Sequence, residues 1–386
     1  MVPDLNWRPT GSLWRHQVMT TTQTPQSAPP DIAAIEAYTA LAAGHATMAI
    51  NAALVTLGDR LGLWKAMAGA GSLTVGALAS VAGVTERYLR EWLSAMTASG
   101  FIAYDELSDT FELPGAGAAV LAAEDSPALF IAPFQFLPLI NEMLPALADG
   151  FRSGAGVSWL DRDSDFCDAE ERFSRPFHRA LLVGVWLASV PGLTERLAAG
   201  AKVADVGCGY GRSTIEMAKA FPNSTFVGFD FHDHSIARGR EIARAEGVAD
   251  RVSFEVADAR ALPGDRYDVV VFCDSLHDMG DPVAAARRAR EILSPGGVLV
   301  SLDPKAAGDS LAANLGDPFA PMLYAVSCFI CTPSAMAQNG PEVLGALAGE
   351  GALRRVLSDA GFTRIERHGH DAPLNMVMVA TKSEEA

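Results

Sequence analysis

The chain has 386 residues, of which 49% are hydrophobic, so it is long enough for two domains with a sizeable core. Its formal net charge of −16 argues against non-specific binding to nucleic acid or to an anionic membrane. Five cysteines without a disulfide framework suit a reducing compartment, and we find no signal peptide and no apolar run long enough to span a membrane. We therefore expect a cytoplasmic protein.

Residues 1–30 are polar and rich in Thr, Gln and Pro, without sustained periodicity. This composition predicts a disordered N-terminal extension. Met19 is a plausible alternative start, and the sequence does not decide between Met1 and Met19.

From Ile32 onward the chain is rich in Ala and has helical periodicity. Two short helices and a hairpin follow, and the ranges predicted for them are Leu73 to Ala82, Thr85 to Ser99, Phe101 to Tyr104 and Thr110 to Leu113. A helix, a second helix and a hairpin make a winged helix, which we place at about Gly58 to Ala123.

Winged helices often bind DNA, but the second helix lacks the charge that such binding needs. Its charged residues cancel, and they are Glu86, Arg87, Arg90 and Glu91. The rest of its surface is apolar, with Tyr88, Leu89, Trp92, Leu93 and Met96. We therefore expect no nucleic-acid binding, because a reader of the major groove presents Arg, Lys, Asn or Gln.

Ser126 to Gly150 is an apolar helical stretch that contains Pro133, Pro138 and Pro145, which should kink or split it. We favour a linker helix packed between domains over direct contact with a substrate. Both roles are compatible, because pockets often lie between domains. A glycine-rich loop, Arg152 to Trp159, and a helix, Phe166 to Trp186, follow.

The segment Lys202 to Arg212 reads as a strand, a glycine turn and the start of a helix. Its glycines, Gly207, Gly209 and Gly211, allow a sharp turn and the close approach of a ligand. The free N–H groups of the following helix point toward that ligand. The sequence therefore predicts a cofactor site here.

Further strands repeat the alternation of strand and helix, and three of them end in polar groups. Ser224 to Phe229 ends at Asp230, about 20 residues after the glycines, where an acidic residue can take both ribose hydroxyls. Arg251 to Val256 is followed by Asp258, and Tyr267 to Phe272 by Cys273 and Asp274. The remaining predictions are a helix at Val283 to Leu293, a strand at Val298 to Leu302, an insertion at 305–344, a helix at Leu347 to Ala360, and strands at Thr363 to His370 and Asn375 to Thr381. Because long insertions tend to be binding segments, we expect the insertion to be a substrate cap.

This succession of motifs resembles the class I S-adenosylmethionine-dependent methyltransferases, in which Gly-x-Gly-x-Gly replaces the Gly-x-Gly-x-x-Gly of dehydrogenases. The resemblance implies an α/β fold with a Rossmann-like seven-stranded sheet, whose last two strands form an antiparallel hairpin at the edge. The N-terminal region is similar to the dimerisation domain of small-molecule O-methyltransferases, which implies a homodimer.

The resemblance also implies roles for the residues that bind S-adenosylmethionine. The three glycines would form the floor beneath the amino-acid portion, Asp205 would contact the amino group directly or through water, and Asp230 would bind the ribose. Asp258 and Ala259 would lie at the adenine edge, although Asp258 could instead cap a helix. Phe231 could flank the adenine or simply pack. Cys208, Cys273 and Asp274 complete the candidate cofactor site, with the two cysteines as small packing residues.

The motif Leu276-His277-Asp278-Met279 resembles the Leu/Cys-His-Asp-Trp of small-molecule O-methyltransferases, whose histidine is the catalytic base. Met279 replaces the usual Trp, so two interpretations of His277 stay open: a catalytic base, or a cap of the loop or the next helix. A positioned base helps a phenol or alcohol lose its proton before methyl transfer.

Several other groups have spacings that metal ligands use, and they are Cys328 with Cys331, His232 with His234, and His368 with His370. Isolated pairs are weak signals, so we expect no metal site.

We therefore predict an extension (1–30), a winged-helix dimerisation domain (31–123), a helical linker and substrate-pocket segment (124–198), and a class I methyltransferase domain (199–386) with a cap at about 305–344. The predicted function is methylation of a small, largely apolar hydroxylated acceptor. The alternatives are a DNA-binding regulator that senses S-adenosylmethionine, or N- or C-methylation on the same fold. The sequence does not identify the acceptor.

Overall fold

The structure is a computed structural model, and it describes residues 31–264 and 266–383. The predicted disordered extension, 1–30, lies outside the described residues. The described residues divide into two units at the boundary between Ile50 and Asn51. Helix α1 (Ile32–Arg60) runs through the division between them, and its residues 32–50 are all exposed.

The winged-helix region has the predicted order of two short helices and a hairpin. Its elements are α2 (Leu63–Met67), α3 (Val75–Ala82), α4 (Glu86–Ala98), β1 (Ala103–Asp105), β2 (Thr110–Glu112) and α5 (Gly115–Leu121). Its core forms around Trp64 and Trp92, which pack edge to face with their ring centroids 4.8 Å apart. Both indole N–H groups are satisfied, since they donate to the carbonyl oxygens of Val55 and Leu54.

Helix α4 buries four of the five residues of its apolar face and exposes one. Leu89, Trp92, Leu93 and Met96 are buried, whereas Tyr88 is 83% exposed. Tyr88 lies at the edge of the apolar stripe, one position before Leu89, and so faces away from the core.

Helix α6 (Ala132–Ser153) is continuous, so its prolines do not split it into short pieces, and the kink that we named as the other outcome stays a prediction. Pro138 and Pro145 each remove one backbone hydrogen bond, but the helix still buries an apolar stripe that includes Leu139 and Leu147. Pro133 lies in the first helical turn, where its missing N–H costs little. The following elements are η1 (Trp159–Asp161), α7 (Ser164–Phe177), η2 (His178–Trp186), η3 (Leu187–Ser189) and α8 (Leu193–Ala199).

The sheet of the C-terminal part has seven strands in the order β5-β4-β3-β6-β7-β9-β8. They are β3 (Lys202–Val206), β4 (Thr225–Asp230), β5 (Val252–Val256), β6 (Tyr267–Cys273), β7 (Leu293–Pro304), β8 (Arg364–His368) and β9 (Asn375–Thr381). The pairs from β5 to β7 are parallel, and β9 pairs antiparallel with both β7 and β8. This arrangement confirms the predicted fold class and its antiparallel edge.

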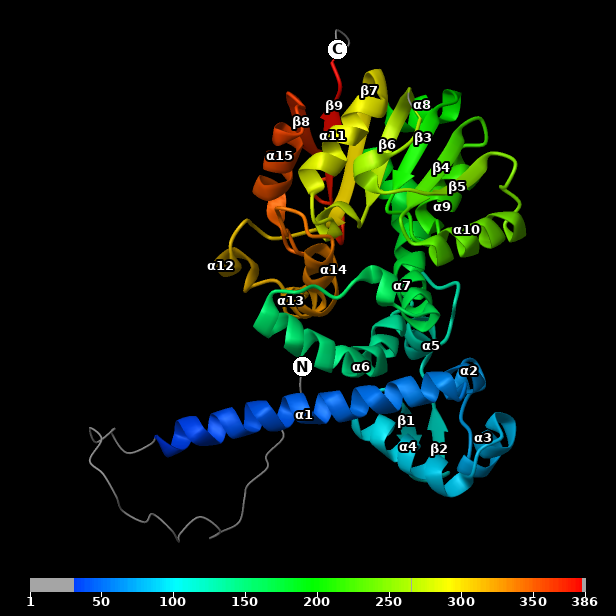
Figure 1. The fold of residues 1–386 in the computed structure, drawn as a ribbon. Helices are drawn as coiled ribbons and strands as arrows, with labels where there is room; N and C mark the ends of the chain where they lie inside the picture. Colours follow the sequence, from blue (N-terminus) through cyan, green and yellow to red (C-terminus); the bar gives the residue numbers. More distant parts are fainter. Residues whose placement is uncertain (1–30, 265, 384–386) are drawn as a thin grey trace, which may run out of the picture. The chain divides into compact units, whose positions relative to one another are not determined.

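Helices cover both faces of this sheet (Figure 1). The helices are α9 (Arg212–Ala220), α10 (Asp233–Ala245), α11 (Pro282–Ile292) and α15 (Gly349–Asp359), with short turns η4 (Ala259–Ala261) and η5 (Leu276–Asp278). One core cluster joins the sheet to α8, α9 and α10, and a second joins it to α11 and α15. The parallel strands are therefore buried on both faces, as their runs of Val and Phe indicate.

The insertion after β7 is helical and contains α12 (Leu311–Asn314), α13 (Ala320–Val326), η6 (Ser327–Cys331) and α14 (Thr332–Ala337). Phe329 and Ile330 pack in one cluster with Leu139 of α6 and Phe166 of α7. Figure 1 shows α13 and α14 on the same side of the sheet as α6 and α7.

Two helical stretches of the described chain are long and apolar enough to cross a membrane, judged by length and composition alone. They are Ile32–Arg60 and Ala320–Ala337, and a bent pair, Ser164–Ser189 with Leu193–Ala199, passes the same test when taken together. The expectation that the chain contains no such run was therefore wrong. The Ala-rich composition of α1 has few charges, which raises its mean hydropathy.

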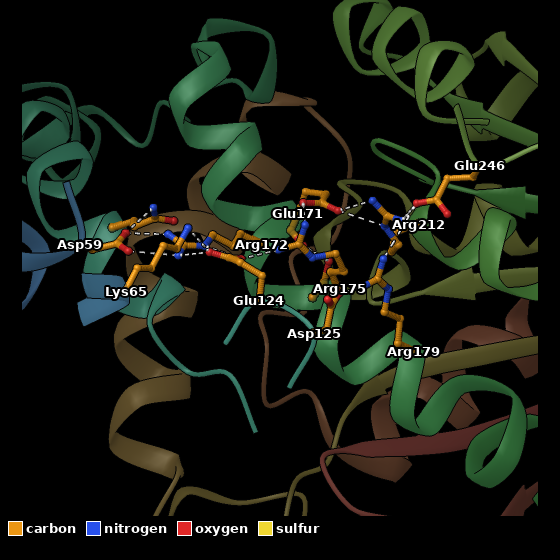
Figure 2. A network of polar contacts seen from close by, with 12 residues as sticks. Asp59, Lys65, Glu124, Asp125, Glu171, Arg172, Arg175, Arg179, Arg212 and Glu246 are labelled. Carbon is orange, nitrogen blue, oxygen red and sulfur yellow. Dashed lines mark hydrogen bonds and ion pairs between the residues drawn. The ribbon is translucent and has the colours of Figure 1, made fainter. Parts of the chain in front are cut away.

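A network of ion pairs runs along α7 from the winged-helix region to the glycine turn (Figure 2). Arg172 pairs with Asp59 and Glu124, each at 2.6 Å. Arg212, the first residue of α9, pairs with Glu171 at 2.7 Å and with Glu246 at 3.0 Å. Because these groups are largely buried, removing one partner would leave an uncompensated charge.

Candidate active site

The glycine turn between β3 and α9 has the backbone that its sequence predicts. Gly207, Gly209 and Gly211 have φ values of 71°, 53° and 73°, a region that favours glycine. A Cβ atom at Gly211 would lie 2.2 Å from the Phe254 ring, whereas one at Gly209 would meet nothing within 4 Å. The turn is therefore packed against Phe254 at Gly211, whereas the space beside Gly209 is open.

Asp205 lies at the end of β3 and is fully buried. Its Oδ2 accepts hydrogen bonds from the Ser213 and Thr214 hydroxyls, both at 2.6 Å. Its Oδ1 has no hydrogen-bond partner in the described part of the chain. Burial raises the pKa of Asp205 above its usual range. A cationic group beside Oδ1 would both satisfy this oxygen and favour its ionised form.

Asp230 connects the end of β4 to the glycine turn. Its Oδ2 accepts from the backbone N–H of Gly209 at 2.9 Å, and its Oδ1 accepts from the N–H of His232 at 2.9 Å. Burial raises the pKa of this carboxyl group. The next residue, Phe231, is 38% exposed.

Asp258 has the capping role that we considered as its alternative. Its carboxylate accepts from the backbone N–H of Arg260 at 2.8 Å and forms an ion pair with the Arg260 side chain at 2.5 Å. It thereby caps η4, which begins at Ala259. The adenine role of Asp258 and Ala259 stays a prediction.

Cys208 in the glycine turn and Cys273 at the end of β6 are both buried, and their packing roles stay a prediction. Asp274 has a φ of 51° and accepts a hydrogen bond from the Asn375 amide at 2.5 Å. Burial raises its pKa to about 7. His178, which the sequence analysis missed, places Nε2 at 3.3 Å from the Cys273 sulfur, and burial lowers its pKa to about 4.

His277 lies in η5 and is buried, with 4% of its surface exposed. Its Nδ1 lies 2.8 Å from Oδ1 of Asp303, and its Nε2 lies 3.3 Å from Oδ1 of Asp278. Burial alone would lower the pKa of His277, but Asp278 and Asp303 outweigh it and raise the pKa well above the usual value. Because Asp303 accepts from Nδ1, Nε2 is the nitrogen that can take a proton from a ligand.

Asp303 is a site residue that the sequence analysis missed. It lies in β7, beyond the predicted end of that strand at Leu302, and it also accepts a hydrogen bond from the Ser301 hydroxyl. A carboxylate one residue past an apolar strand of the sheet was the available signal, since such positions lie at the ligand-binding edge.

The cap contributes Cys331 to the surroundings of His277. Ligand atoms of His277, Asp278 and Cys331 lie within 4.8 Å of one another, and those of His178, Cys273 and Asp274 form a second such group. Both groups have the composition of metal sites, so the expected absence of a metal stays a prediction. Cys328, the other half of the Cys-x-x-Cys spacing, is exposed and takes no part.

Helix α7 contributes Glu170, which sequence reasoning also missed. Burial, together with the charges of Glu171, Asp274 and Asp278, raises its pKa to about 8. Asp274 and Asp278 are therefore among the carboxyl groups whose charges favour the protonated form of Glu170. Glu170 is one of several acidic residues in the helix predicted at Phe166 to Trp186, and nothing in the sequence distinguishes it from those at the surface.

Comparison with known families assigns both parts of the chain. Residues 197–346 match the family described as "Methyltransferase domain", and residues 49–123 match an "Rv2258c-like winged HTH domain". With the strand order above, these matches decide the assignment. The chain carries a class I methyltransferase domain. Its cofactor class is S-adenosylmethionine, and a winged helix-turn-helix domain precedes it.

The chain matches only part of the length of its curated relatives. Over 116 residues, or 28% of this chain, it is 40% identical to the "27-O-demethylrifamycin SV methyltransferase" of Amycolatopsis mediterranei. That match spans 42% of the Amycolatopsis enzyme, less than half of its length.

Solved structures resemble the chain over nearly its whole length. An O-methyltransferase family protein from Burkholderia thailandensis has a TM-score of 0.65 at 18% identity, covering 93% of this chain and 100% of its own. Human N-acetylserotonin methyltransferase, solved with S-adenosylmethionine, has a TM-score of 0.65 at 16% identity, with the same shares covered. At such identities the likeness establishes the fold alone.

Proposed function

We propose that this protein transfers the methyl group of S-adenosylmethionine to the hydroxyl oxygen of a small, largely apolar acceptor. The observation that carries the proposal is the buried pair of His277 and Asp303, joined at 2.8 Å. It lies at the carboxyl ends of the strands, where open α/β sheets bind their ligands. The O-methyl transfer named for the Amycolatopsis relative supports the same chemistry.

The residues around the glycine turn fit S-adenosylmethionine. The unpartnered Oδ1 of Asp205 suits the ammonium group of the cofactor, and the open face of Gly209 admits its backbone. Asp230 would bind the ribose hydroxyls while it still accepts from the N–H of Gly209. The bound cofactor would supply an electrophilic methyl group on a positively charged sulfur.

His277 would act as the general base. Its Nε2 takes the proton of the acceptor hydroxyl, while Asp303 fixes the ring through Nδ1 and stabilises the imidazolium that forms. A pKa above the usual histidine value brings the base closer to a phenol, whose pKa is about 10. The same shift means that the free enzyme must lose a proton before His277 can act.

The apolar walls for the acceptor would come from α6, α7 and the cap. Leu139, Phe166 and Ile330 are buried together there, and the half-buried side chains packed against them are Phe136, Met143, Trp159, Val326 and Phe329. Cys331 of the cap reaches His277, which supports the role of the insertion as a substrate cap.

The alternatives stay distinguishable from this proposal. A DNA-binding regulator would need free cations on α4, but Arg87 pairs with Glu91 at 2.5 Å and Arg90 with Asp109 at 2.7 Å. Salt-dependent DNA binding in a gel shift would favour the regulator. N- or C-methylation keeps the cofactor and changes the atom that receives the methyl group.

Two measurements test the proposal. Calorimetry of the purified protein should show binding of S-adenosylmethionine and of S-adenosylhomocysteine. Incubation with methyl-labelled S-adenosylmethionine and a cell extract should then transfer the label to a small molecule through an oxygen–carbon bond. No heat with either cofactor form would end the proposal, and label on nitrogen or carbon would replace O-methylation by its alternative.

We also propose that the protein forms a homodimer through its N-terminal region. The apolar side chains of α1 are exposed in the single chain, among them Ile35, Tyr38, Leu41 and Met48. A second copy would cover them. Sedimentation of the purified protein should give twice the mass of one chain, and a monomer, or recovery with membranes, would contradict the dimer. We propose the cytoplasm as its location, since all five cysteines are free.

A further inference from the structure

Arg162, between η1 and α7, has a buried guanidinium group without a carboxylate partner. The residue is 7% exposed. One terminal nitrogen contacts the sulfur of Met143, and the other lies 3.4 Å from the carbonyl oxygen of Phe329. Its Nε has no hydrogen-bond partner and its side chain forms no ion pair with any residue that the structure describes.

The comparison with Arg212 shows how unusual this environment is. Arg212 is equally buried, at 7% exposed, but its guanidinium lies between Glu171 and Glu246 (Figure 2). A buried charge is ordinarily compensated in this way, because the loss of hydration must be offset by pairing. Burial lowers the pKa of Arg162 to about 10, so it still carries its charge at neutral pH.

The surroundings of Arg162 are those proposed for the acceptor. Its guanidinium carbon lies 4.4 Å from the centre of the Phe166 ring, within the apolar cluster of α6, α7 and the cap. Phe329, whose carbonyl it approaches, is two residues before Cys331, which reaches His277. Burial lowers the pKa of Arg162, and Asp278, whose Oδ1 lies 3.3 Å from Nε2 of His277, opposes that effect.

Arg162 thus has an unused donor beside an apolar cluster, and the cap segment that contains Phe329 also brings Cys331 close to His277. An aromatic compound with an oxyanion for Arg162 and a hydroxyl group for the deprotonated His277 would suit both groups. The guanidinium is suited to such an anion, because its donors match a carboxylate in a bidentate geometry.

We propose that Arg162 binds an anionic group of the acceptor, so that the substrate is an aromatic hydroxy acid rather than a neutral phenol. This inference rests on the function proposed above. It narrows the acceptor class to compounds that carry a carboxylate, sulfonate or phosphate in addition to the hydroxyl group that receives the methyl.

The test compares a charged probe with its neutral isostere. The probes are 3-hydroxy-2-naphthoate and 3-hydroxy-2-naphthamide, each titrated calorimetrically into the full-length protein with and without S-adenosylhomocysteine. We expect the wild type to bind the acid at least about tenfold more tightly than the amide, and Arg162→Gln to lose this preference while still binding the amide. Arg152→Gln, at an exposed position at the end of α6, is the matched control and should keep it.

Melting temperatures separate this role from a structural one. Arg162→Met removes an uncompensated buried charge, so we expect a melting temperature equal to or above that of the wild type. A clear decrease would mark Arg162 as structural and overturn the proposal. So would a wild type that binds the acid no better than the amide, or an Arg162→Gln variant that loses S-adenosylhomocysteine instead. If the wild type does not bind S-adenosylhomocysteine, the proposed function is wrong. The preference for the acid over the amide is a separate result, because it is also measured in the absence of S-adenosylhomocysteine.

Discussion

The cofactor side and the acceptor side of the candidate site differ in how their polar atoms are satisfied. Around the glycine turn, most of these atoms already have partners: Asp230 accepts from Gly209 and His232, and Asp205 accepts from two hydroxyl groups. On the acceptor side, Nε of Arg162 and Oδ1 of Asp278 are buried without a hydrogen bond to any described residue, although Oδ1 of Asp278 lies 3.3 Å from Nε2 of His277.

This difference teaches which part of the site is preformed. The cofactor side holds its geometry through its own hydrogen bonds, and Oδ1 of Asp205 is left for the ligand. The acceptor side is incomplete until a ligand supplies the missing partners, because a buried polar atom without a partner costs free energy. Specificity should therefore reside in the acceptor side, and general affinity for the cofactor in the glycine turn.

The largest expected effect concerns the base on the acceptor side. His277→Ala should lower kcat by about 10²–10⁴-fold, because the acceptor loses its positioned base. The wild type should lose activity as the pH falls through the pKa of His277, which lies above the usual histidine value, since only the neutral ring accepts a proton. A pH–rate profile with the labelled acceptor checks both.

The exposed His370 provides the control for this experiment. His370→Ala should keep the rate and the pH profile of the wild type. Unchanged kcat in His277→Ala across the pH range would show that the acceptor needs no base from this residue. The acceptor side would then have no catalytic role that distinguishes it from the cofactor side.

A smaller effect is expected on the cofactor side, where two glycines can be compared. Gly211→Ala should destabilise the fold by about 2–6 kcal/mol, since it adds strain at positive φ and a clash with Phe254. Gly209→Ala should cost about 1–2 kcal/mol and leave the protein folded, but its methyl group would occupy the open face of the turn. Urea denaturation measures the first effect, and calorimetry with S-adenosylhomocysteine the second.

The two variants should therefore separate stability from binding. Wild-type affinity for S-adenosylhomocysteine in Gly209→Ala would mean that the cofactor does not lie over this part of the turn. A Gly211→Ala variant as stable as the wild type would show that Phe254 moves away, so that the turn is less rigid than its packing indicates.

The sequence was sufficient to predict the sheet and the cofactor side, because their signals are local. The glycine turn, the strands and the acidic residue at the end of β4 lie within a short stretch of chain and carry a repeated pattern. The edge hairpin followed from the same repetition. Which apolar residue of α4 stays exposed, Tyr88, did not follow from the pattern, because a periodic pattern does not fix the edge of an apolar stripe.

The acceptor side could not be predicted in this way, because it combines distant segments. Asp303 and Cys331 reach His277 from a strand end and a cap helix, and Arg162 reaches the carbonyl oxygen of Phe329 in the cap from a loop. None of them stands in a recognisable spacing relative to the histidine. Their approach depends on tertiary packing, and the same holds for Glu170 on α7.

Helix α7 carries adjacent residues with different tasks. Burial and neighbouring carboxyl groups raise the pKa of Glu170, while Glu171 and Arg172 belong to the ion-pair network that reaches Arg212 and Asp59. A chimera with its boundary before α7 would separate Arg172 from Asp59, and one with its boundary after α7 would separate Glu171 from Arg212. Either exchange would leave a largely buried charge without its partner, so the winged helix, α7 and the methyltransferase domain should be inherited together.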